Sequence, residues 1–271
     1  MNVRSKVKQY LEYCEFRKEL DAKTLKAYRI DLRQYFDFVH SDNPQKDEIE
    51  IYITDLHKKY KQKTVKRKIA SVKAFYAFLE GEEIITENPF RKIRVKFKET
   101  FVLPRIIPRS EIEKLLNSMY VSFQLSRTDQ PQARYLLRDI AIVEVFFATG
   151  ARVYEISNIK ADCIDIESGV IRIMGKGDKE RCVQISEESI LRLLKKYYQS
   201  NKKAIKESGY FFVNRQGKRF TEQSIRMMLK KYTKLAGITR NITPHMFRHS
   251  FATYLIEEGV DVSCVQQILG H

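Results

Sequence analysis

The chain has 271 residues, more than one average domain, so its length favours two domains. Its 50 basic and 34 acidic side chains give a net charge of +16, which indicates a polyanionic partner. The four cysteines form no C-x-x-C pair, which argues against a zinc site or a disulfide framework and fits a reducing cytoplasm. No apolar stretch is typical of a signal peptide or a membrane span, so the sequence predicts a cytoplasmic protein without a membrane partner.

The first hundred residues have the spacing of a small helical bundle. Apolar side chains recur at helical intervals over residues 3–18, 22–39, 47–60 and 64–81. Asp21 is placed to cap the second helix and Thr64 to cap the fourth, which Gly81 ends.

A run of cations lies at the end of the third predicted helix and along the fourth. No acidic residue occurs between Asp55 and Glu80. A solvated helix face is the ordinary explanation of a charge run, but a run without compensating acids on a chain of this net charge favours contact with nucleic-acid phosphates. Such contacts supply affinity and do not read sequence. The predicted DNA-binding residues, called the basic run below, are Lys58, Lys59, Lys61, Lys63, Lys66, Arg67, Lys68 and Lys73.

Residues 87–110 predict an extended basic linker, because three prolines interrupt a stretch without apolar periodicity. We therefore expect one domain over residues 1–100, including the linker, and a second over residues 101–271.

The second domain is predicted to be helical with one small antiparallel sheet. A helix begins at Ser110, an irregular polar segment follows at 121–133, and an apolar helix ends at Gly150. Three short strands follow, with the sequences CIDI, VIRIM and RCVQI. Further helices are expected over 187–199, 221–235, 244–258 and 261–269. The predicted fold class is thus mainly α, with an N-terminal helical bundle and an α+β second domain.

Three stretches carry candidate chemistry: ATGARVYEI at 148–156, IMGKGDKER at 173–181 and TPHMFRHSFATYL at 243–255. Each motif alone is weak, but in this order, and followed by ILGH, they resemble the tyrosine recombinase, or phage integrase, family. The segments TLKAYRIDLRQYFDFV and SVKAFYAFLEGEEIITENPF are similar to the family's N-terminal SAM-like core-binding domain. The resemblance implies a catalytic second domain and the compact two-domain organisation of the Xer-like members.

The resemblance also implies roles for individual residues. Glu155 matches the acidic residue that supports the first catalytic arginine, and His249, directly after Arg248, also belongs to the family pattern as a supporting, helix-packing residue. The positions that match the family's catalytic residues are Arg152, Lys176, His245, Arg248 and His271.

Phosphodiester chemistry accounts for these residue types. Attack on a phosphodiester concentrates charge on the non-bridging oxygens, which the guanidiniums of Arg152 and Arg248 can stabilise without a metal ion or another cofactor. Lys176 can donate a proton to the leaving 5′ oxygen, and His245 can accept one from an attacking phenol. His271 can donate a hydrogen bond to a phosphate oxygen. His245 and His249 are also four residues apart, a spacing that can bind zinc, but HMFRH lacks the glutamate of the metalloprotease motif.

In the family the nucleophilic tyrosine lies about nine residues beyond the LGH motif. The last tyrosine here is Tyr254, whose apolar neighbours indicate a core position. We therefore expect this chain to bind DNA without cleaving it; a trimmed chain, an incomplete sequence or a shortened gene would each account for the ending, and the intact remaining motifs favour the first two.

The resemblance implies double-stranded DNA as the partner. It also implies a homotetramer on DNA for the full-length protein, and we expect a monomer free in solution. Two other functions stay open, a noncatalytic DNA-binding regulator of recombination sites and, less favoured, a type IB topoisomerase.

Overall fold

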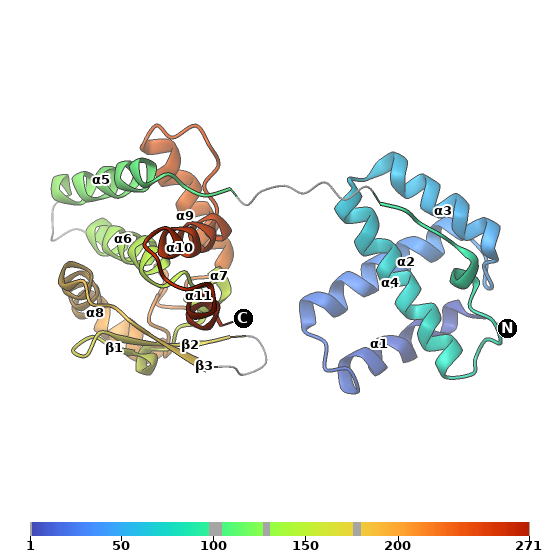
Figure 1. The fold of residues 1–271 in the computed structure, drawn as a ribbon. Helices are drawn as coiled ribbons and strands as arrows, with labels where there is room; N and C mark the ends of the chain where they lie inside the picture. The colour runs from blue at the N-terminus through green and yellow to red at the C-terminus, as the bar shows by residue number, and fades with distance from the viewer. Residues whose placement is uncertain (1, 98–104, 127–130, 176–179, 271) are drawn as a thin grey trace. The chain divides into compact units, whose positions relative to one another are not determined.

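The computed structural model describes residues 2–97, 105–126, 131–175 and 180–270, and the chain divides into two compact units, Met1–Phe101 and Val102–His271 (Figure 1). Each unit has its own apolar core. Lys176 and His271 fall outside the described residues.

The first unit is a bundle of helices around an aromatic core. Its elements are η1 (Arg4–Lys6), α1 (Val7–Phe16), α2 (Ala22–Val39), α3 (Lys46–Lys59), α4 (Gln62–Gly81) and η2 (Pro89–Lys92). Tyr10, Phe36 and Phe75 are fully buried where α1, α2 and α4 meet. The cap predicted at Asp21 is confirmed, because its carboxylate accepts from the amides of Lys23 and Thr24.

Two predictions for this unit need correction. Helix α4 begins two residues before Thr64, with Lys61 as its N-cap residue and no side-chain cap. The predicted linker is also structured at its start, because Pro89–Lys92 forms a 3₁₀ turn that buries Phe90 in the core of the first unit. At the linker's other end Ile107 is buried in the core of the second unit.

The second unit surrounds helix α6 with other helices and a small sheet (Figure 1). Its elements are α5 (Arg109–Leu125), α6 (Pro131–Thr149), α7 (Val153–Asn158), η3 (Ala161–Cys163), β1 (Ile164–Asp165), β2 (Val170–Met174), β3 (Glu180–Gln184), α8 (Glu188–Ser208), α9 (Glu222–Leu235), α10 (Pro244–Glu257) and α11 (Val262–Leu269). The strands pair antiparallel in the order β1-β2-β3, with Ile171 opposite Val183.

The predicted fold class is confirmed for the described residues, although some helix bounds differ. Helix α5 continues to Leu125, with Phe123 packed against the core, so the irregular segment predicted from residue 121 begins too early. Helix α8 continues to Ser208, where Ile205 is buried and Gly209 adopts the left-handed conformation that ends a helix. Within the described ranges no helix has both the length and the apolar character needed to cross a membrane.

Candidate active site

Gly150 sets the direction of the chain between α6 and the first motif arginine. Its φ of +57° lies in the left-handed region, and a Cβ there would lie 2.5 Å from Phe251 Cδ1 and 2.9 Å from Leu269 Cδ2. Only glycine meets both conditions without strain. The chain can therefore turn directly from the buried α6 into Arg152, which is the N-cap residue of α7.

Arg152 is held by Glu155 in a capping box. The backbone amide of Arg152 donates to Glu155 Oε2 at 2.8 Å, and Arg152 Nη1 donates to Glu155 Oε1 at 2.9 Å. The Arg152 side chain keeps 39% of its surface exposed, whereas Glu155 keeps 2%. The carboxylate is therefore internal while the guanidinium it orients reaches solvent.

Arg181 on β3 binds the same carboxylate from the sheet side. Its Nη1 donates to Glu155 Oε1 at 3.1 Å and its Nη2 donates to Oε2 at 2.7 Å. Burial acts to raise the pKa of Glu155, but the hydrogen bonds from Arg181 and Arg152 outweigh it and hold that pKa below its usual range. Glu155 is thus an ionised, buried anchor for two arginines.

Arg248 on α10 connects the backbone that precedes Arg152 to the end of α11. Its Nη1 donates to the carbonyl of Gly150 at 3.0 Å, and its Nη2 donates to the carbonyl of Leu269, at the end of α11, at 2.7 Å. The residue is 8% exposed. Burial, followed by the positive charges of Arg152 and Arg181, lowers the pKa of Arg248 to about 10 despite the opposing effect of Glu155.

Arg152, Arg181 and Arg248, called the arginine cluster below, surround a single described carboxylate, that of Glu155. Arg152 and Arg181 bind this anion directly, and their positive charges act on the buried guanidinium of Arg248. An anion bound beside Arg152 would relieve this repulsion. A phosphodiester oxygen fits that requirement, because guanidinium groups bind phosphate through two parallel hydrogen bonds.

Of the other predicted catalytic residues, only His245 lies among the described residues. His245 lies in the first turn of α10, one turn before Arg248, and is exposed. His249 is exposed on the same helix. Lys176 lies in the sequence between β2 and β3, and His271 follows Gly270, but both are outside the described residues. In the part of the chain that is described, no three His, Cys, Asp or Glu side chains lie together as a metal site.

Arg181 is the functional candidate that the sequence prediction did not assign. It falls inside the IMGKGDKER motif, and in β3 it lies two residues before the buried Val183, on the same face of the strand. An arginine at an inward-facing position of a short strand signals a buried carboxylate partner, because an unpaired buried charge is costly. The sequence pattern therefore indicated an acidic partner for Arg181, although it does not identify Glu155 as that partner.

The basic run is exposed at seven of its eight positions, and Lys68 is the exception. Lys68 is 3% exposed, and its Nζ donates to the fully buried Asp31 at 3.1 Å. Asp31 also accepts from Arg67 and from Ser71. The prediction that Lys68 contacts DNA is corrected accordingly, since its ammonium neutralises a carboxylate between α2 and α4.

Tyr254 packs within the second unit. Its hydroxyl donates to the carbonyl of Ile107 at 2.5 Å, and the guanidinium of Arg109 lies 4.7 Å from the ring centroid. The side chain is half-buried rather than fully internal. Its phenol is therefore engaged with the backbone at the start of the second unit.

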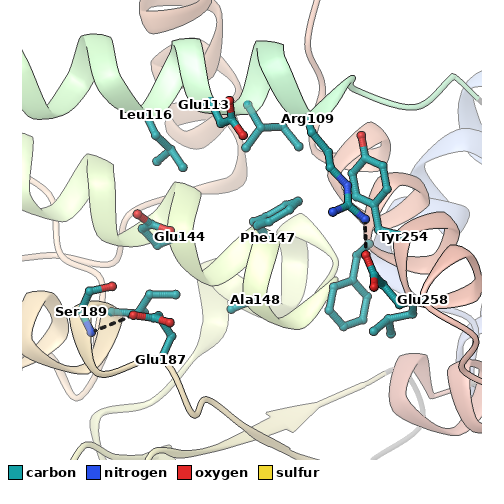
Figure 2. A pocket seen from close by; sticks show the side chains of 14 residues that line it. Arg109, Glu113, Leu116, Glu144, Phe147, Ala148, Glu187, Ser189, Tyr254 and Glu258 are labelled. Carbon is teal, nitrogen blue, oxygen red and sulfur yellow. Dashed lines mark hydrogen bonds and ion pairs between the residues drawn. The ribbon is translucent and has the colours of Figure 1, made fainter.

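A separate pocket of about 600 Å³ lies among α5, α6, α8 and α10 (Figure 2). Apolar side chains such as Phe147 and Leu116 line it, together with the carboxylates of Glu113, Glu144 and Glu187. Its one arginine, Arg109, pairs with Glu258 at 2.6 Å. An apolar pocket bordered by carboxylates repels a phosphate, so the arginine cluster and not this pocket is the candidate phosphate site.

Both units resemble known protein domains. Residues 107–271 match the phage integrase family, and residues 7–83 match the family's N-terminal SAM-like domain. The chain belongs to the tyrosine recombinase, or phage integrase, family. A tyrosine recombinase from Agathobacter rectalis is 45% identical over 100% of the chain and 89% of the relative. A tyrosine recombinase XerC from Oceanobacillus iheyensis is 31% identical over 97% of the chain and 86% of the relative.

Solved structures of recombinases share the fold. The XerA recombinase is 27% identical, with a TM-score of 0.53 over 99% of this chain and 88% of that one. The XerH recombinase bound to its difH substrate gives a TM-score of 0.74 at 20% identity, over 99% of this chain and 77% of that one. As a tyrosine recombinase family member, the chain falls in a class of DNA-recombining enzymes.

Proposed function

We propose that the chain is the DNA-binding and phosphate-activating part of a site-specific recombinase that cuts and rejoins duplex DNA through a 3′-phosphotyrosine. The observation that carries the proposal is the arginine cluster, in which Glu155 orients an exposed Arg152 beside the buried cation of Arg248. A 45% identical relative described as a tyrosine recombinase supports the same activity.

The proposed roles follow from the charges that develop during transesterification. Arg152 and Arg248 bind the non-bridging oxygens and stabilise the charge of the pentacoordinate phosphorus, and His271 donates a further hydrogen bond. His245 accepts the proton of the attacking phenol, Lys176 donates a proton to the leaving 5′ oxygen, and His249 supports α10. The bond energy is kept in the phosphotyrosyl ester, so no cofactor or metal is required by this chemistry.

DNA binding is proposed to use the exposed members of the basic run together with the charge of the second unit. Lys61 and Lys63 lie at the start of α4, where the helix dipole adds to their positive charge. The XerH structure that shares the fold is described as bound to its difH substrate, a λ integrase structure as bound to DNA, and another λ integrase structure as a tetramer on a Holliday junction. We infer that a full-length form of this protein acts in the cytoplasm as a homotetramer on two duplexes.

The nucleophile is proposed to lie outside residues 1–271. Tyr254 is the last tyrosine of the sequence, and its hydroxyl is hydrogen-bonded to the Ile107 carbonyl. We therefore expect these residues to bind a target duplex and to form no covalent adduct with it.

Selection of binding sites from random duplex DNA, followed by a suicide-substrate cleavage assay, tests the proposal. The assay compares residues 1–271 with a form extended by a tyrosine-bearing C-terminal segment of the family. We expect specific binding by both, an adduct only from the extended form, and its loss in R152A and R248A but not in R172A, a change to an exposed arginine of β2.

An adduct that survives both R152A and R248A would overturn the proposed site. Site-specific binding by the extended form without any adduct would favour the noncatalytic regulator. Relaxation of supercoiled plasmid without the selected site would favour a topoisomerase.

A further inference from the structure

Arg181 connects three segments that each carry a catalytic motif. It lies on β3, directly after the segment that contains Lys176. Through Glu155 it is joined to Arg152 at the start of α7. Its side chain also lies against the end of α11, because a Cβ on Gly270 would be 3.3 Å from Arg181 Cδ and 3.4 Å from Arg181 Nη1. Gly270 immediately precedes His271.

The guanidinium of Arg181 is placed to orient and not to contact a substrate. Its side chain is 10% exposed, whereas that of Arg152 is 39% exposed. Both Nη atoms of Arg181 bind Glu155 in the bidentate manner that fixes the plane of a carboxylate. Its buried Nε has no hydrogen-bond partner among the described residues. Such a donor is retained at a cost, which favours a role for the residue beyond packing.

The carboxylate of Glu155 receives four hydrogen bonds from two residues. Oε1 accepts from Arg152 Nη1 and Arg181 Nη1, and Oε2 accepts from the Arg152 amide and Arg181 Nη2. Without Arg181, half of these bonds disappear and Glu155 can rotate about its terminal torsion. The guanidinium of Arg152 would then lose its fixed direction, although its bond partner would remain.

We propose that Arg181 is a positioning residue that, through Glu155, fixes the guanidinium of Arg152 for phosphate binding and aligns β3 with the end of α11. The inference rests on the proposed function and deepens it, because it assigns a role to a residue outside the matched catalytic positions. Arg181 acts through geometry, so a lysine at this position keeps the charge and loses the function.

Inorganic phosphate provides a test that needs neither a target sequence nor a nucleophile. The Nε–Hε signals of Arg152 and Arg248, assigned by NMR in ¹⁵N-arginine-labelled protein, are followed during a phosphate titration. In the wild-type chain we expect both signals to shift together. In R181K we expect the Arg152 signal to move before phosphate is added, and the apparent Kd for phosphate to rise about tenfold, the scale of one missing charge-assisted hydrogen bond.

Two further variants separate positioning from folding and from charge. R172K alters an exposed arginine of the neighbouring strand β2 and should leave the phosphate Kd within about twofold, as expected for a surface change. In an E155Q background, R181K should change the Kd by less than about threefold, because the residue through which Arg181 acts has already been altered. Thermal unfolding of each variant reports whether it is folded at the titration temperature.

A wild-type Kd in R181K, or an R181K effect of equal size with and without E155Q, would overturn the positioning role. If neither Arg152 nor Arg248 in the wild-type chain responds to phosphate, the proposed active site itself fails. The two failures are therefore distinguishable.

Discussion

The carboxylate of Glu155 makes the site depend on pH. Its pKa is held low in the folded protein because the hydrogen bonds from Arg181 and Arg152 outweigh the opposing effect of burial. A carboxylate with a lowered folded-state pKa binds fewer protons than the unfolded chain does near the ordinary value of about 4.3. Its stabilising contribution is complete above that value and disappears as the pH falls through the folded-state pKa.

We expect E155Q to lower the free energy of unfolding by about 3 kcal/mol at pH 7, because it leaves two arginines without their buried counter-charge. The difference from wild type should shrink as the pH is lowered below about 4, where the wild-type carboxylate also becomes protonated. Urea unfolding at pH 7, 4 and 3 measures it. A difference that stays constant across these pH values would show that ionisation of Glu155 is not what stabilises the site.

Substitution of Gly150 tests the backbone geometry of the site. G150A should lower the free energy of unfolding by about 2–4 kcal/mol, through left-handed strain and overlap with Phe251. G81A is the matched control, since a Cβ there meets nothing within 4 Å and Gly81 has no left-handed φ. Equal unfolding free energies for the two variants would contradict the packing described at Gly150.

At the scale of elements, helix α4 illustrates what sequence patterns can and cannot provide. Lys68 shares its helical face with Val65 and Val72, and Asp31 of α2 shares its face with Tyr28 and Tyr35, so the apolar period already placed both charges inward. The period cannot show that the ammonium of Lys68 pairs with the carboxylate of Asp31. The pairing depends on how α2 and α4 pack, and the sequence therefore assigned Lys68 to DNA phosphates together with the rest of the basic run.

Replacement of Asp31 tests this buried pair. D31A should destabilise the first unit by about 3–5 kcal/mol, since it leaves Lys68 buried without its counter-charge. D37A changes an exposed aspartate of the same helix, paired with Arg4 at 2.9 Å, and should cost less than about 1 kcal/mol. Hydrogen exchange of α2 and α4 amides measures both. Similar protection in the two variants would refute a stabilising role for the interior pair.

At the scale of the whole molecule, the sequence predicted the fold class and the family because they depend on long, periodic helices and on ordered motifs. Residues such as Arg181 were missed because their roles arise from contacts between segments far apart in the chain. The ends of α5 and α8 were misplaced for a related reason. Packing of Phe123 against the core and burial of Ile205 extend the two helices beyond the ends that local sequence predicted.

DNA affinity should depend on salt through the basic run. K61Q/K63Q should weaken binding to the selected duplex and to unrelated duplexes by the same factor. It should also reduce the slope of log K against log salt by about 0.9 for each phosphate that the variant no longer neutralises. K202Q/K203Q removes the same charge from α8, outside the run, and should leave the slope nearly unchanged. Equal slope changes in the two double variants would mean that net charge alone, and not the run, governs binding.

The proposed function requires Arg152 and Arg248 to bind one scissile phosphate. A crystal structure of residues 1–271 on the selected duplex would show whether they do. We predict guanidinium nitrogens of both arginines within hydrogen-bond distance of the non-bridging oxygens of a single phosphate, with Arg181 still bound to Glu155 behind them. A complex in which the two arginines contact different phosphates, or in which the DNA lies away from the arginine cluster, would rule out the shared phosphate site.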